Sequence, residues 1–248
     1  MQDRDTLKNR HVAVLGGSSG VGLATVRRLA AAGAHVVATG RDDAKLRAAL
    51  AGLGPLGADV RAAAFDANDR AALDAFFAGF GAGRLDHLVL TLSGGEGAGP
   101  LAQLDLAALR RGFEAKFWPQ LSAAQAALPA LARGGSITFV SAISARIANP
   151  GYAGLAAING ALEAMIGSLA RELAPSRVNA VSPGVIDTPW WDRVPAAAKA
   201  AVFAQQAAGN PAGRVGQPDD VAHAIQFLVE NGFMTGAVIE CDGGMRLL

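Results

Sequence analysis

A segment rich in glycine and serine near the N-terminus carries the clearest chemical signal in this sequence. It follows a short apolar run, precedes a segment with helical periodicity, and consists of Gly16, Gly17, Ser18, Ser19, Gly20, Val21 and Gly22. Glycines permit a tight turn here, and they let backbone N–H groups approach a pyrophosphate at the start of a helix. The context favours a dinucleotide phosphate loop, with an ordinary strand-to-helix turn as the alternative.

The end of the second expected strand bears on which dinucleotide is bound. An acidic residue at that point would bind the ribose 2′-hydroxyl and repel a 2′-phosphate, but this chain has Gly40 followed by Arg41. A guanidinium binds phosphate through forked donors, so the sequence favours NADP(H) over NAD(H). The alternative is that Arg41 is a solvated charge that pairs with Asp42 or Asp43.

The elements that must position these residues alternate along the whole chain. Short β-branched runs and longer alanine-rich amphipathic segments follow one another, which is typical of strand–helix–strand units in a parallel sheet. We expect strands at His11–Leu15, His35–Thr39, Val60–Phe65, His87–Leu92, Ser136–Ser141, Arg177–Val181 and Ala237–Cys241. Helices are expected at Val21–Ala32, Asp43–Ala51, Asp69–Phe80, Asp105–Leu131, Tyr152–Ala174 and Pro218–Glu230. At 248 residues, the chain is expected to form one α/β domain, residues 1–248.

One long stretch, residues 183–213, lacks a confident element and is interpreted as a substrate lid or binding loop. Three of its residues, Trp190, Trp191 and Phe203, are unusual in a chain with only 6% aromatic residues. They indicate an apolar substrate, or else they pack beneath the lid or in a subunit interface.

The glycine loop and later landmarks together resemble the short-chain dehydrogenase/reductase family. Gly16, Gly20 and Gly22 match its TGxxxGxG loop, with Leu15 at the threonine. Further matches over nearly the whole chain are Asp66, Pro183-Gly184 with Thr188, the run Arg214 to Ala222, Thr235-Gly236 and Asp242 to Gly244. The resemblance implies a Rossmann-type, doubly wound, seven-stranded parallel sheet with helices on both faces. It also implies that Asp66 and Ala67 hold the adenine, that Ile186 and Thr188 meet the nicotinamide carboxamide, and that Ser93 and Gly94 line the nicotinamide side in place of the family's NNAG loop.

The same resemblance puts other residues at all four catalytic positions of the family. Leu155 stands at the tyrosine, Asn159 at the lysine, Ala142 at the serine and Lys116 at the asparagine. An amide and an ammonium have thus exchanged places between two helices. We hypothesise that Lys116 and Asn159 are functional, with Lys116 orienting the cofactor or favouring the anion of a nearby hydroxyl such as that of Tyr152. Tyr152, three residues before Leu155, is a candidate replacement for the missing proton donor, and Ser141 and Ser144 are also near. The alternatives are drift in an abandoned site, with Lys116 extending to solvent, and a packing role for Tyr152.

Two functions therefore remain open. The first is an NADP(H)-dependent oxidoreductase acting on a carbonyl or an activated double bond, with an atypical active site. The second is a cofactor-binding protein without redox turnover, either a regulatory module or a scaffold for chemistry such as a cyclisation.

Composition narrows the class of partner. The 22 basic residues nearly balance the 21 acidic residues, without a run of like charge, so nucleic acid is not expected as a partner. One cysteine and four scattered histidines indicate neither a disulfide nor a metal site, and they favour a reducing, cytoplasmic location. Neither a signal peptide nor a membrane span is expected. The resemblance implies a homodimer or homotetramer that pairs through the helices carrying Lys116 and Tyr152.

Overall fold

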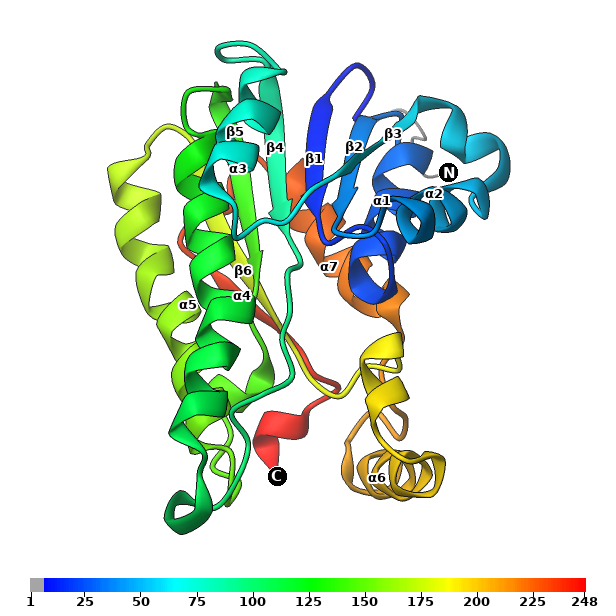
Figure 1. The fold of residues 1–248 in the computed structure, drawn as a ribbon, viewed down its shortest axis with the longest axis vertical. Coiled ribbons are helices and arrows are strands. Elements are labelled where there is room, and N and C mark those ends of the chain that lie inside the picture. Colours follow the sequence, from blue (N-terminus) through cyan, green and yellow to red (C-terminus); the bar gives the residue numbers. More distant parts are fainter. Residues whose placement is uncertain (1–6) are drawn as a thin grey trace.

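The computed structural model describes residues 7–248 and shows one sheet covered by helices on both faces (Figure 1). The strands are β1 (His11–Leu15), β2 (His35–Gly40), β3 (Val60–Ala64), β4 (Leu85–Leu90), β5 (Leu131–Val140), β6 (Arg177–Pro183) and β7 (Val238–Cys241). The helices are α1 (Gly20–Ala31), α2 (Asp43–Ala51), α3 (Arg70–Ala78), α4 (Leu106–Ala127), α5 (Ala153–Glu172), α6 (Ala196–Gly209) and α7 (Pro218–Glu230). The expected doubly wound α/β class is confirmed.

The seven strands are all parallel, in the order β3-β2-β1-β4-β5-β6-β7. The chain runs outward from β1 to β3 and then returns to place β4 against the other side of β1. The direction of winding therefore reverses between β1 and β4. In open α/β sheets, ligands bind outside the carboxyl ends of the strands at such a reversal point.

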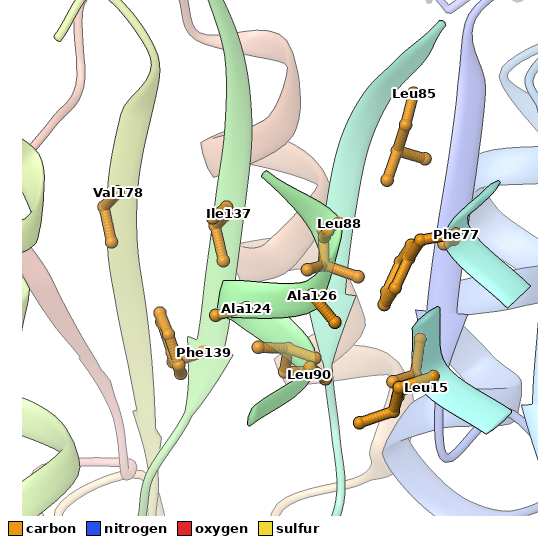
Figure 2. Packing of buried hydrophobic residues seen from close by; sticks show 14 of the residues in the cluster. Leu15, Phe77, Leu85, Leu88, Leu90, Ala124, Ala126, Ile137, Phe139 and Val178 are labelled. Carbon is orange, nitrogen blue, oxygen red and sulfur yellow. The ribbon is translucent and has the colours of Figure 1, made fainter. Parts of the chain in front are cut away.

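Both faces of the sheet are buried, and for this reason the central strands are apolar at successive positions. Along β1, Ala13 and Leu15 pack into the core shared with α3, α4 and α5, whereas Val12 and Val14 face α1, α2 and α7. Figure 2 shows the first core, in which Phe77 of α3 and two alanines of α4 lie against leucines of the sheet. Small alanine side chains allow α4 to approach the strands closely.

The structure corrects the expectation for residues 183–213. This stretch is not irregular, because it contains the 14-residue helix α6 and a short 3-10 helix, η4 (Pro189–Arg193). Helix α6 has no buried residue, so it is not held to the sheet by an apolar face as α1, α3 and α5 are. Figure 1 shows α6 beyond the carboxyl ends of the strands, apart from the sheet.

Helix α5 bears on the expectation of no membrane span. By length and composition, it is the one helix within residues 7–248 that could cross a membrane, with a mean hydropathy of 1.3. A core helix of a soluble protein passes the same test, and α5 packs against β6 and α4, so this is weak evidence. Helix α5 was not expected to be long and apolar enough to pass this test, and the absence of a membrane span stays a prediction.

Candidate functional site

The residues singled out from the sequence gather at the carboxyl ends of the strands. The glycine loop follows β1, Arg41 follows β2, Asp66 follows β3, Ser93 follows β4 and the segment from Gly184 follows β6. All strands are parallel, so these loops share the lower edge of the sheet in Figure 1. The reversal point between β1 and β4 lies at the centre of this edge.

The glycine loop is packed so tightly that side chains would not fit. Gly16 has a φ of +90°, a conformation that L side chains rarely adopt. A Cβ atom on Gly22 would lie 2.1 Å from the carbonyl oxygen of Gly16 and 2.6 Å from Oγ1 of Thr91. Thr91 in turn donates to the carbonyl of Leu15 at 2.7 Å. The loop is therefore fixed against the ends of β1 and β4, with its backbone close to the reversal point.

The first turn of α1 is open to an anion. Ser19 is its N-cap residue, but its side chain makes no capping hydrogen bond, and no acidic residue lies in the first turn. The first N–H groups of a helix carry a partial positive charge and need an acceptor. Together with the close-packed glycines, this end of α1 fits a phosphate.

Arg41 is exposed beside this loop, and its alternative partners are already engaged. The carboxylate of Asp43 pairs with Arg47 at 2.8 Å, and that of Asp42 caps α2 by accepting from the N–H of Lys45 at 2.9 Å. Within residues 7–248, Arg41 forms no ion pair. Its guanidinium is left available to a phosphate, as the sequence indicates.

Asp66 and Ala67 lie where the resemblance puts the adenine. Oδ1 of Asp66 accepts hydrogen bonds from the N–H and the side-chain amide of Asn68, at 3.0 and 3.2 Å. Ala67 is buried. The exposed Asp66 carboxylate keeps its second oxygen for a donor such as an exocyclic amine.

The segment after β6 returns to the glycine loop. Pro183 ends β6, and Gly184 packs against Asp242 so closely that a Cβ atom would lie 2.9 Å from the Asp242 Cα. Ile186 then forms a parallel bridge with Gly216. A Cβ atom on Gly20 would lie 3.2 Å from the side chain of Thr188, so this segment reaches the first turn of α1.

The 3-10 helix η4 is hydrogen-bonded to the loop after β4. The indole N–H of Trp190 donates to the carbonyl of Gly94 at 2.8 Å, and Arg193 stacks over the Trp190 ring at 4.5 Å. Trp191 packs edge-on against both Trp190 and Phe203, with ring centroids 5.0 and 5.3 Å apart. These aromatic residues therefore pack within residues 183–213, in line with the second of the two interpretations above.

Lys116 is buried, so the alternative in which it extends to solvent is wrong. It lies on α4, is 8% exposed, and its Nζ donates to the carbonyl of Ser141, just beyond β5, at 2.8 Å. Burial lowers the pKa of Lys116 to about 7, and the carboxylate of Glu163 opposes this shift. Only one of its three N–H donors is used by a described residue.

Asn159 converges on the same segment from α5. Its Nδ2 donates to Oγ of Ser144 and to the carbonyl of Leu155, both at 3.0 Å. Its Oδ1 is buried and has no hydrogen-bond partner within residues 7–248. A buried acceptor without a partner is unfavourable, so this oxygen is suited to a donor supplied by a ligand.

The structure does not bring Tyr152 together with Lys116 or Asn159. Tyr152 is the N-cap residue of α5 and is 36% exposed, and its hydroxyl forms no hydrogen bond with a described residue. Its role as a proton donor stays a prediction.

One charged group close to this site, Glu163, was not predicted from the sequence. Glu163 lies on α5, one turn after Asn159, and its side chain is 10% exposed. Its carboxylate accepts from the hydroxyls of Ser141 and Ser182 at 2.7 and 2.8 Å and from Arg146 at 2.7 Å. The available signal was a single acid in the middle of an alanine-rich apolar helix, at a position where the chain could have had another apolar residue.

Two hollows of about 320 Å³ are present, and Lys116, Asn159 and the glycine loop line neither of them. One lies on the sheet face beside α3, between Arg61 and Phe80, and the other lies at the base of the 183–213 segment, between Ile186 and Asp242. Ile186, one of the residues expected at the nicotinamide, lines the second hollow. No group of three or more His, Cys, Asp or Glu residues within residues 7–248 could hold a metal ion.

Comparison with known proteins identifies relatives over nearly the whole chain. The family model described as enoyl-(acyl carrier protein) reductase matches residues 16–246. The chain is 36% identical to cis-4-hydroxycyclohexanecarboxylate dehydrogenase of Sinomonas cyclohexanicum, over 97% of this chain and 98% of that protein.

Two solved structures extend the comparison to three dimensions. A small-chain dehydrogenase in complex with NADPH has a TM-score of 0.82 and 31% identity, covering 97% of this chain and 100% of the other. The MalC reductase/Diels-Alderase of Malbranchea aurantiaca has a TM-score of 0.88 and 27% identity, covering 99% of both chains.

Proposed function

Since this chain belongs to the short-chain dehydrogenase/reductase family, we propose that it is an NADP(H)-dependent oxidoreductase with an atypical catalytic set. It catalyses the reduction of a carbonyl group or an activated double bond, or the reverse oxidation. The observation that carries this proposal is the pair formed by Lys116, a buried cation with unused donors, and Asn159, a buried amide with an unpaired oxygen. Both lie at the end of the sheet where the glycine loop lies.

The residues present fit the cofactor. The uncapped start of α1 and the glycine loop would hold the pyrophosphate, Arg41 the 2′-phosphate, and Asp66 with Ala67 the adenine. Pro183, Gly184, Ile186 and Thr188 would form the nicotinamide side together with Ser93 and Gly94. The unpaired Oδ1 of Asn159 would accept from a ribose hydroxyl. When bound, the cofactor supplies the hydride.

Lys116 replaces the missing tyrosine as the group that meets the substrate oxygen. Its ammonium has donors left after it binds the Ser141 carbonyl, and burial weakens its hold on the proton, with a pKa of about 7. A general acid is most effective when its pKa lies near the working pH, and it contributes about 10² to 10⁴ in rate. Positioning contributes about 7 to 11 kcal/mol, so the family's tyrosine is not indispensable to the rate.

The remaining residues have supporting roles in this proposal. Asn159 holds Ser144 and the cofactor ribose, and Tyr152 is a second candidate donor at the entrance of α5. Residues 183–213 act as a lid over the substrate, fastened where Trp190 binds Gly94. The aromatic side chains of the lid pack against one another between η4 and α6, and this packing stiffens the lid.

The names of the relatives bear on the substrate class. The family model carries the name of a reductase for enoyl double bonds, and the Sinomonas relative is a dehydrogenase of a hydroxylated cyclohexane carboxylate. We therefore propose a cyclic or unsaturated carbonyl compound as substrate. Consumption of NADPH, followed by absorbance with a panel of cyclic ketones and enones, tests the proposal, because a redox enzyme oxidises NADPH with at least one panel member.

One observation favours a second candidate function. Leu155 and Asn159 occupy the positions of the family's tyrosine and lysine, and the MalC protein, similar over the whole chain, is described as both a reductase and a Diels-Alderase. A non-redox cyclisation in the same pocket is therefore the alternative. Tight NADPH binding without NADPH oxidation by any panel member would favour it.

We expect Arg41→Ala to lower NADPH affinity at least tenfold, about 1.4 kcal/mol, and to leave NADH affinity unchanged. The physical reason is that Arg41 has no carboxylate partner within residues 7–248 and can pair with the 2′-phosphate. Fluorescence titration with both cofactors measures the preference. Arg47→Ala, which removes a neighbouring guanidinium already paired with Asp43, is the matched control. An unchanged preference in Arg41→Ala would refute the assignment.

We also expect a homodimer or homotetramer paired through α4 and α5. A Cβ atom on Gly160 or Gly167 of α5 would have no neighbour within 4 Å, and Trp118 of α4 is 48% exposed. Small residues on one helix and an exposed aromatic ring on the next allow close pairing of two copies. Light scattering at micromolar concentration measures the mass, and a monomer would contradict this expectation.

A further inference from the structure

The side chain of Glu163 connects α5 through hydrogen bonds to the ends of β5 and β6. Its Oε1 accepts from the hydroxyl of Ser141, just after β5, and from that of Ser182 in β6, whereas its Oε2 accepts from Nε of Arg146. Two hydroxyl donors and one guanidinium donor therefore surround the two oxygens of this side chain. The structure thus holds a negative charge in an almost buried place.

The charges around Glu163 do not balance among themselves. Arg146 also pairs with Glu240 of β7, with its Nη1 2.9 Å from Oε1 of Glu240. One guanidinium between two carboxylates leaves one negative charge in excess. An excess charge with little solvent around it is unfavourable unless a cation lies near.

Lys116 provides that cation from the other side of Ser141. Its Nζ donates to the Ser141 carbonyl at 2.8 Å, while the Ser141 hydroxyl donates to Glu163 at 2.7 Å. One residue therefore connects the two side chains, and it is itself buried. Protonated Lys116 brings the group of Lys116, Arg146, Glu163 and Glu240 to neutrality.

Other charged groups contribute little at Lys116. Ser144 and Asn159 approach the same segment from η3 (Ile143–Ala145) and α5, and neither carries a charge. Glu114, the nearest charged residue in sequence on α4, is exposed. Among the groups of the described chain that shift the pKa of Lys116, Glu163 alone acts by charge.

We propose that Glu163 is a positioning residue whose carboxylate keeps Lys116 protonated, so that Lys116 can serve as cation and proton donor. This inference rests on the role proposed above for Lys116. It predicts that, when the Glu163 charge is lost, Lys116 is a buried neutral amine at and above neutral pH and cannot act as a proton donor to the substrate.

The test is a titration of Lys116 by NMR of its side-chain nitrogen, assigned through the signal lost in Lys116→Met. In Glu163→Gln, we expect the midpoint to fall by at least about half a pH unit from its wild-type value. Glu163→Asp is the matched control, because it disturbs the same hydrogen bonds but keeps the charge. Its midpoint should stay close to that of the wild type, although both variants should lose thermal stability.

The possible results distinguish an effect of the Glu163 charge from a structural effect of the substitution. They also distinguish the coupling of Glu163 to Lys116 from the proposed role of Lys116. An unchanged midpoint in Glu163→Gln, or an equal fall in Glu163→Asp, would overturn the inference. If Glu163→Gln does not fold, Glu240→Gln is measured in its place. Arg146 then neutralises Glu163 more fully, so the titration midpoint of Lys116 should fall by less but in the same direction. A constant or raised midpoint in Glu240→Gln would overturn the inference. If the midpoint falls as expected but NADPH affinity and turnover of Glu163→Gln at pH 8 equal those of the wild type, the coupling of the two charges stands and the proposed role of Lys116 is wrong.

Discussion

Replacement of Lys116 by Met is expected to lower NADPH affinity or turnover at least tenfold. Methionine keeps much of the stem but removes the ammonium and with it the donors that the Ser141 carbonyl does not use. Cofactor titration and NADPH oxidation measure the two quantities. Lys8→Met, at an exposed position before β1 and at the opposite end of the sheet, is the control and should match the wild type. Unchanged affinity together with unchanged turnover in Lys116→Met would contradict the proposed role.

The same variant should change how stability depends on pH. Burial holds the pKa of Lys116 at about 7, below its ordinary value of 10.5. Between these values the folded protein binds fewer protons than the unfolded chain, so the free energy of unfolding rises with pH, by up to about 1.4 kcal/mol per pH unit from this group. Lys116→Met lacks this contribution. Denaturation at pH 7 and pH 9 should therefore show the wild type gaining stability relative to the variant as the pH rises.

Gly22→Ala is expected to lower NADPH affinity by about a hundredfold, or about 2.7 kcal/mol. The added methyl group would lie 2.1 Å from the Gly16 carbonyl oxygen, a backbone atom that cannot move without opening the phosphate loop. Overpacking of this kind also costs about 1 to 3 kcal/mol of stability. Cofactor titration and thermal unfolding measure both effects.

Gly232→Ala is the control for this variant. Gly232 lies between α7 and β7, its φ is outside the left-handed region, and a Cβ atom there would have no neighbour within 4 Å. Neither NADPH affinity nor thermal stability should change appreciably in Gly232→Ala. If Gly22→Ala binds NADPH as tightly as Gly232→Ala, the loop is not the phosphate site.

The fold could be predicted from local patterns, and the exception has a physical reason. Buried strands such as β1 are apolar at successive positions and end at glycine, so their place and order along the chain are visible in the sequence. Helix α6 was missed because prolines and glycines flank it on both sides, so the whole segment was interpreted as a loop. Its helical propensity was the signal that remained.

The position of the glycine loop was also predictable, whereas the surroundings of Lys116 were not. A glycine loop between a strand and a helix has a fixed local geometry, so its place follows from a few adjacent residues. The burial of Lys116 depends on how α4 packs against the end of β5, and its counter-charge comes from Glu163, 47 positions further along the chain. Such contacts between distant segments are set by packing and leave no local pattern.

The central claim is that Lys116 and Asn159 serve an NADP(H) site, and a structure of the NADPH complex tests it most directly. The account predicts the 2′-phosphate on Arg41, a ribose hydroxyl within hydrogen-bond distance of Oδ1 of Asn159, and Nζ of Lys116 within reach of a ligand oxygen at the nicotinamide end. A complex in which the nicotinamide lies away from both side chains, with Nζ of Lys116 bound only to the Ser141 carbonyl, would contradict it.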